Sequence, residues 1–166
     1  DFNAMDGIDL NMDLEGYSTG FRTDLTPDND SSLTLQGDAI IGNTQGFIST
    51  TDIPTASMVQ QDVNSNLDNF NLLSHYRREL GDYGSLNFQS SLGRYNCSSP
   101  VYKFRSDTLD FDFQYEFSPL PDHKAQWGLG YRLTRMHSST ETSALDFAED
   151  DQDMPLFSAF VQDEIS

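Results

Sequence analysis

The chain has 166 residues and a formal net charge of −18, from 27 acidic and 9 basic residues. This balance excludes binding to nucleic acid, because such binding depends on clustered Lys and Arg. It disfavours adhesion to an anionic membrane surface for the same reason. The mean hydropathy of −0.55 is that of a polar chain, but twelve Phe, seven Tyr and one Trp argue against a disordered one.

The length predicts a single domain. The single cysteine, Cys97, excludes an internal disulfide and a paired-thiol zinc site. No apolar run approaches the roughly 20 residues that a membrane helix needs. The chain starts at Asp1 without a visible signal peptide, and its last residues read as a strand that stops abruptly. We therefore expect a fragment or a processed segment of a longer protein.

Period-two alternation of apolar and polar residues is the dominant signal along the chain, and it predicts half-buried strands. The clearest stretch runs from Leu109 to Phe117, where each odd position is large and apolar and each even position is acidic or amide. A strand places these two sets on opposite faces, whereas a helix scatters them. In chain order, the alternation predicts about seven strands, over residues 17–25, 33–41, 69–80, 86–92, 109–117, 125–134 and 157–166.

The predicted strands are long, roughly 10 to 15 residues each, which suits membrane-spanning strands better than globular ones. Short turns rich in Pro, Gly, Asn and Asp are predicted at residues 27–30, 81–84 and 119–123. Longer polar stretches lie between them, at residues 42–65, 97–104 and 137–154. Short turns at one rim and long loops at the other are typical of an outer-membrane barrel. The predicted fold is thus an all-β antiparallel up-and-down meander, part of a transmembrane barrel.

The two faces of the predicted strands differ in composition. The polar face mixes amide, hydroxyl and charged side chains, which is typical of the hydrated lumen of a barrel. The apolar face carries aromatic residues and Leu, which is typical of a lipid-facing surface with aromatic girdles. The lumen-facing candidates are Arg22, Asp24, Gln36, Asp38, Arg77, Glu79, Asp110, Asp112 and Arg132. The lipid-facing or girdle candidates are Tyr17, Phe21, Tyr76, Leu109, Phe111, Phe113, Tyr115, Trp127 and Tyr131. A soluble β-sandwich alternates in the same way, so that alternative stays open.

Four segments resemble barrel strands of TonB-dependent receptors, in the same order along the chain. Residues 157–164, with the sequence FSAFVQDE, are similar to a strand that follows an extracellular loop in that family, and residues 127–132 resemble the strand before it. Residues 32–38 and 107–114 are similar to early barrel strands. The resemblance covers residues 16–166 and implies a partial barrel, because the whole barrel has about 22 strands. Residues 1–15 are predicted to be an acidic tail or the end of an earlier loop.

The resemblance implies energised uptake of a ferric siderophore, cobalamin or a similar nutrient across the outer membrane of a Gram-negative bacterium. It also implies partners: outer-membrane lipid, the plug domain and remaining barrel of the parent protein, and TonB, through an N-terminal region that this sequence lacks. Candidate ligand contacts from an extracellular loop are Tyr95, Tyr102 and Phe104. The alternatives are a passive porin or structural barrel, and a soluble all-β ligand-binding module.

Signatures of catalysis are missing from the sequence, which has no nucleophile elbow, Gly-rich phosphate loop or His-Glu-x-x-His motif. We therefore predict no enzyme activity and no cofactor. Asp110 and Asp112 form a carboxylate pair, but we expect them to line the wall opposite Arg22, Arg77 or Arg132 rather than to act as acid and base.

Candidate metal ligands are scattered or lie in a polar loop. The histidines, His75, His123 and His137, are far apart and favour hydrated side chains over a metal site. The acidic run at residues 149–153 is predicted to be a solvated loop, because it lacks the spacing of a calcium-binding loop.

Overall fold

The computed structural model describes residues 13–52, 57–100, 102–140 and 150–165, and side chains over 15–46, 63–100, 102–140 and 151–165. Seven strands and one short 3₁₀ turn, η1 (Gly81–Tyr83), make up these residues. The strands are β1 (Asp13–Asp28), β2 (Ser31–Asp52), β3 (Ser57–Glu79), β4 (Ser85–Ser98), β5 (Tyr102–Leu120), β6 (His123–Thr140) and β7 (Asp150–Ile165). Among the described residues, no helix has the length and apolar character to cross a membrane.

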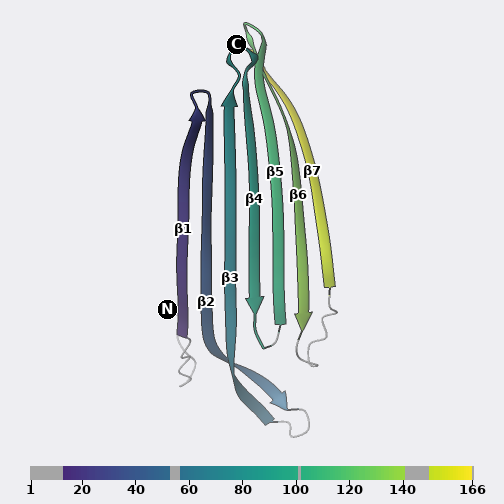
Figure 1. The fold of residues 1–166 in the computed structure, drawn as a ribbon. Helices are drawn as coiled ribbons and strands as arrows, with labels where there is room; N and C mark the ends of the chain where they lie inside the picture. Colours follow the sequence, from purple (N-terminus) through teal and green to yellow (C-terminus); the bar gives the residue numbers. More distant parts are fainter. Residues whose placement is uncertain (1–12, 53–56, 101, 141–149, 166) are drawn as a thin grey trace.

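The strands form one sheet in the order β1-β2-β3-β4-β5-β6-β7, and each neighbouring pair is antiparallel. This arrangement confirms the predicted all-β up-and-down meander of seven strands (Figure 1). The sheet is open, with β1 and β7 as its two edges. Closure into a barrel, and insertion into a membrane, therefore stay predictions.

The register gathers the apolar residues of the strands on one face, because directly paired residues of an antiparallel sheet share a face. One row of paired residues crosses all seven strands, through Phe21, Gly37, Leu72, Leu92, Leu109, Leu133 and Pro155. The row beside it runs through Thr23, Leu35, Ser74, Ser90, Phe111, Tyr131 and Phe157. We call this side the apolar face and the opposite side the polar face.

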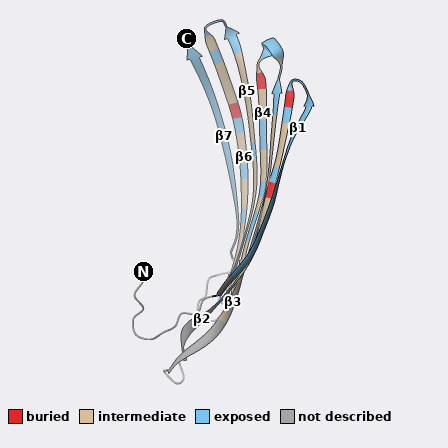
Figure 2. Cartoon of the chain, turned by 90° about the vertical axis from the view of Figure 1, so that its left-hand side faces the viewer, coloured by how far each residue is buried: buried red, intermediate tan, exposed pale blue. Residues whose placement is uncertain are grey.

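Within the described residues, neither face is covered by a second layer, as the edge-on view in Figure 2 shows. Among the described residues no large apolar side chain is buried, and the buried residues are Ser31, Gly37, Ser85 and Gly128. Large apolar side chains are strongly exposed instead, with Tyr17 at 80% and Val161 at 84% of their full accessible surface. The sheet is therefore held by its backbone ladder and by cross-strand side-chain contacts, without a hydrophobic core of its own.

The strands are longer than the sequence predicts, between 14 and 23 residues. Residues 42–65 were expected to form a loop, but β2 and β3 continue through most of them, and the loop expected at 97–104 is replaced by strand at 97–98 and 102–104, with residues 99 and 100 between the strands. The backbone ladder continues where the apolar alternation ends, because polar side chains also pair across strands. Asn43 Nδ2, for example, donates to Asn66 Oδ1 at 2.7 Å. Residues 141–149 of the third predicted loop lie outside the described residues.

The three predicted short turns are confirmed, and all lie at one end of the sheet, which we call the turn end (Figure 1). The connection between β3 and β4 depends on two glycines with positive φ, Gly81 at 61° and Gly84 at 101°. A Cβ on Gly84 would lie 1.9 Å from the carbonyl oxygen of Glu116, whereas one on Gly81 would meet nothing within 4 Å. Gly84 thus lets the turn approach the backbone of β5.

Substituting these two glycines tests the turn. We expect Gly84→Ala to lower the urea midpoint strongly or to prevent folding, because backbone atoms of β5 cannot move aside without breaking the ladder. Gly81→Ala is the control and should cost only the strain of a left-handed alanine, about 1 kcal/mol. Circular dichroism during urea unfolding in detergent micelles measures both. Equal effects of the two substitutions would contradict the close approach at Gly84.

Candidate functional site

All nine lumen-facing candidates lie on the polar face, as the register shows. Asp38 pairs with Asn71, Arg77 with Asn87, and Asp110 with Ser91. The face therefore carries mostly polar side chains across β1 to β6, with a few apolar ones such as Ile40 and Leu73 among them. Whether it lines a lumen stays a prediction.

The densest polar contacts of this face join β5 and β6. Arg132 Nε donates to Asp110 Oδ2 at 2.5 Å, and the Asp110 side chain is only 19% exposed. Gln114 donates to Asp112 at 2.8 Å, and Gln126 donates in turn to Gln114 at 3.1 Å. Of the three arginines expected to face Asp110, the structure brings Arg132 to it. These contacts satisfy the carboxylates locally, so the pair does not resemble an acid–base couple.

The remaining charged candidates of the polar face also have partners close by. Arg22 binds Asp24 along β1 at 3.0 Å, and Asp24 accepts a hydrogen bond from the Thr34 hydroxyl at 2.7 Å. Arg77 binds Glu79 along β3 at 2.7 Å. Because opposite charges neighbour each other, the polar face has no strong excess of either sign at these places.

A shallow hollow of about 270 Å³ lies over β2 to β5. Its polar lining includes Gln36, Asp38, Asn71 and Thr108, and Tyr95 lies at its edge toward the end of β4. The hollow does not enclose a small ligand.

The three aromatic ligand-contact candidates lie in strands, which corrects the predicted loop. Tyr95 belongs to β4, and Tyr102 and Phe104 belong to β5. The rings of Tyr95 and Phe104 meet edge to face with centroids 6.0 Å apart, and the Tyr102 hydroxyl lies 3.6 Å from the sulfur of Cys97. The register places all three on the polar face. They were misread because the connection between β4 and β5 is much shorter than the polar stretch suggests.

All nine lipid-facing or girdle candidates lie on the apolar face, and several touch one another. Trp127 contacts Phe113 and Tyr115, with ring centroids 5.4 and 6.2 Å apart. Tyr131 contacts Phe157 at 4.7 Å. Tyr115 and Trp127 lie at the turn end, where the Tyr115 hydroxyl donates to the carbonyl oxygen of Tyr83 at 2.5 Å. Contact with lipid stays a prediction.

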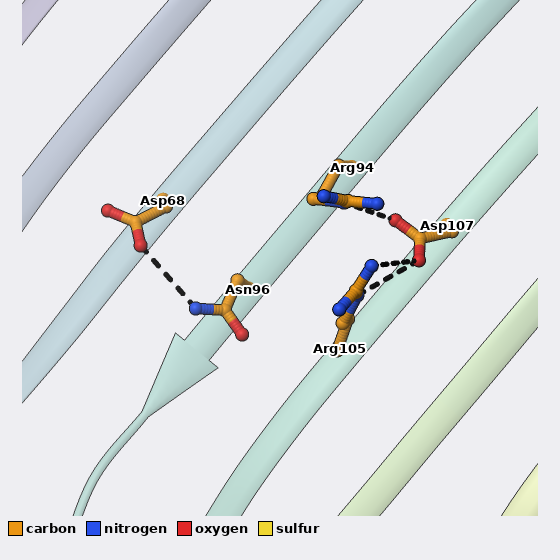
Figure 3. Close-up of polar contacts among 5 residues, drawn as sticks. All are labelled: Asp68, Arg94, Asn96, Arg105 and Asp107. Carbon is orange, nitrogen blue, oxygen red and sulfur yellow. Dashed lines mark hydrogen bonds and ion pairs between the residues drawn. The ribbon is translucent and has the colours of Figure 1, made fainter.

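Sequence reasoning missed a group of cations on the apolar face, at the end opposite to the turn end. We call Arg94, Lys103, Arg105 and Arg135 the basic cluster; they come from β4, β5 and β6. Figure 3 shows Arg94 and Arg105 joined to different carboxylate oxygens of Asp107. The two contacts measure 2.6 and 2.8 Å. Alternation in the sequence shows on which face a residue lies, but not which residues of the neighbouring strands lie opposite it. The basic cluster is therefore recognisable only from the strand register.

The histidines stay separate from one another. His75 lies on the polar face opposite Gln89, His123 binds Asp163 at 2.8 Å, and His137 binds Asp151. In the described part of the chain, no three His, Cys, Asp or Glu side chains are grouped so that they could hold a metal ion.

The acidic run corrects the predicted solvated loop, because its residues 150–153 begin β7. Two of its carboxylates face basic partners on β6. Asp151 binds His137, and Asp153 lies 3.3 Å from Arg135. Residue 149 lies outside the described residues.

The pair between Asp110 and Arg132 should contribute to stability. We expect a double-mutant cycle with Asp110→Asn and Arg132→Gln, followed by urea unfolding in detergent, to give a coupling of about 1 kcal/mol, at the upper end for partly exposed pairs. The pair of Arg22 and Asp24 is the control. Its side chains are 61% and 60% exposed, so its coupling should be close to zero. A larger coupling in the control pair would contradict this assignment.

Comparisons with family models, curated proteins and solved structures found no match to this chain.

Proposed function

We propose that the chain is a wall segment of an outer-membrane TonB-dependent receptor, which imports a ferric siderophore, cobalamin or a similar nutrient. The observation that carries the proposal is the uncovered apolar face. Apolar side chains from all seven strands meet there, and no layer of the described chain covers them. Exposed apolar surface of this extent needs a nonaqueous environment or a partner.

The dimensions of the apolar face suit a bilayer. On β5 the apolar positions run from Leu109 to Phe117, and on β6 from Ala125 to Leu133. Nine residues are joined by eight steps of about 3.4 Å each, which span roughly 27 Å along the strand. For tilted strands this is close to the apolar band of outer-membrane barrels, about 25 Å tall, and to the 9–11 residues that a spanning strand needs.

The apolar face also runs obliquely across the sheet. At the end away from the turns, the last apolar residue of this face on β2 is Ile41, and on β5 it is Leu109. Pairing places Ile41 in the same row as Arg105 of β5, which is four residues before Leu109. At the turn end, the last apolar residue on β2 is Leu33, and on β5 it is Phe117. Pairing places Leu33 in the same row as Phe113, which is again four residues before Phe117. Four residues are about 14 Å along the strand, and three strand spacings are about 14 Å across. The margins stay level between β1 and β2, where Tyr17 pairs with Ile41, and between β5 and β6, where Leu109 pairs with Leu133. Over the five strand spacings from β1 to β6, about 24 Å, the face is therefore inclined by about 30°, near the strand tilt of 35–45° in outer-membrane barrels.

The composition of the polar face supports the same proposal. Its charges are partnered by neighbouring side chains, and its rows mix amides, hydroxyls and small residues such as Gly128 and Gly130. A Cβ on Gly128 would lie 2.4 Å from the Phe160 ring, so this position accommodates a larger neighbour on the same face. A hydrated wall of this kind suits a receptor lumen. The nutrient itself comes from the family resemblance.

Adjacent serines of β4 test the membrane environment of the two faces. Ser90 lies on the apolar face opposite Phe111, and Ser91 lies on the polar face opposite Asp110. We expect Ser90→Arg to reduce folding into lipid vesicles by about 2–4 kcal/mol, the cost of Arg near the bilayer midplane. Ser91→Arg, the matched control, should have little effect. Urea titration of folding in vesicles measures both; equal effects, or a folded monomer in plain buffer, would overturn the membrane proposal.

Uptake in cells separates the receptor from a passive porin. In cells that express the parent protein, accumulation of labelled ferric siderophore or cobalamin should require both a functional TonB complex and an energised inner membrane. Deleting TonB should abolish accumulation while leaving the amount of receptor in the outer membrane unchanged. Accumulation that persists without TonB would favour the porin and contradict the receptor.

A further inference from the structure

The polar face is almost free of charge at the end away from the turn end. Three of its rows cross β4 at residues 93, 95 and 97, and Asp38 is the one ionised group among their described side chains. The nearest cations of this face, Arg22 and Arg132, lie in the next row toward the turn end, and each binds a carboxylate. Among the described side chains of these rows, an anionic ligand would therefore meet a negative charge and no unpaired positive one.

The hollow over β2 to β5 lies at this end of the face and includes Gly93, where the row lacks a side chain. Gly93 pairs with Asn71 on β3 and with Thr108 on β5. A Cβ on Gly93 would meet one atom within 4 Å, the side-chain oxygen of Asn71 at 3.3 Å. Gly128 on the same face differs, because the ring of Phe160 occupies the space where its Cβ would lie. The space above Gly93 is thus open to a ligand.

The side chains around Gly93 offer hydrogen bonds to a ligand. Asn71 Nδ2 donates to Asp38 Oδ2 at 3.1 Å, which leaves the Asn71 oxygen directed toward Gly93 as an acceptor. The second oxygen of Asp38 is a further acceptor. Ser106 and Thr108 add hydroxyl groups to the lining, and a hydroxyl group both donates and accepts. This combination complements a neutral molecule that is rich in hydroxyl groups.

An aromatic ring borders the hollow on the side away from the turn end. Tyr95 follows Gly93 by two residues on β4, so both lie on the polar face, and Tyr95 pairs with Asn69 and Ser106. Its ring packs edge to face against Phe104 with centroids 6.0 Å apart, and Tyr95 is still 39% exposed. The contact with Phe104 restricts the orientation of the ring, and the exposed part offers an apolar surface beside the hydrogen-bonding groups.

We propose that the hollow is a subsite for one unit of a neutral glycan. This inference rests on the proposed receptor wall and narrows its nutrient to a saccharide. Sugar hydroxyl groups donate and accept hydrogen bonds, as the groups beside Gly93 require, and the C–H groups of a sugar ring pack against Tyr95. The hollow of about 270 Å³ is smaller than enclosed ligand pockets of about 300–1,000 Å³. It therefore holds one sugar ring while the rest of the glycan crosses the open face.

The test measures saturation transfer by proton NMR from the full chain to two oligosaccharides of equal length. Maltohexaose is neutral, and hexagalacturonate carries a carboxylate on each unit. Phosphocholine micelles hold the chain, because they contain no sugar that would compete. We expect transfer to maltohexaose at millimolar concentration and a dissociation constant for hexagalacturonate that is about fivefold higher or more, from repulsion by Asp38. Asp38→Asn should remove most of this difference.

Two variants and a matched control locate the subsite. Gly93→Val fills the hollow and should abolish most of the transfer to maltohexaose. Tyr95→Leu should raise the dissociation constant about threefold to tenfold, the value of one aromatic contact. Gly42→Val is the control, because Gly42 lies on the same face outside the hollow and its Cβ would make only ordinary contacts. It should leave the transfer unchanged. Circular dichroism checks that each variant keeps the sheet.

The remaining outcomes separate this inference from the proposed function. Absence of transfer from the original chain, or an equal loss in Gly42→Val, overturns the glycan subsite, while Ser90→Arg and Ser91→Arg decide the membrane wall independently. Equal binding of the two oligosaccharides overturns the selection against anions. If a neutral ferric trihydroxamate displaces maltohexaose at equal concentration, the hollow accepts neutral polar ligands in general and the saccharide assignment is wrong.

Discussion

The backbone ladder between neighbouring strands is the interaction on which the rest of the structure depends. Each strand bonds to the next in sequence, and the described residues have no hydrophobic core that would hold the sheet from above or below. Strand pairing satisfies the backbone polar groups, which is a requirement of any chain that crosses hydrocarbon. It leaves the two faces free to meet different surroundings, and it leaves β1 and β7 as edges that need pairing or cover.

The different composition of the two faces follows from this arrangement. Because pairing aligns the strands without a slip that would exchange faces, their separate apolar stripes add up to one surface. The same alignment brings Asp110 to Arg132 on the other face and Arg94 to Asp107 at the margin of the apolar face. The proposed wall, with lipid on one side and water on the other, is a consequence of a single register.

Much of this arrangement is predictable from local pattern, and specific parts are not. The alternation from Leu109 to Phe117 assigns each residue to a face, and Pro27, Gly81 and Pro121 mark the reversals, because these signals depend on neighbours in sequence. The ends of the strands away from the turn end are not predictable in this way. There the side chains are polar on both faces, so Tyr95 and Phe104 read as loop although the ladder continues through them.

The sequence alone determined the fold class, the number of strands and the face on which each predicted wall residue lies, since a period of two is a property of the strand itself. The tertiary structure decided the levels, that is, which residues lie opposite one another. It extended the strands, paired the acidic start of β7 with β6, and gathered Arg94, Lys103, Arg105 and Arg135 into one cluster. The physical reason is that register is set by turns and by non-local pairing.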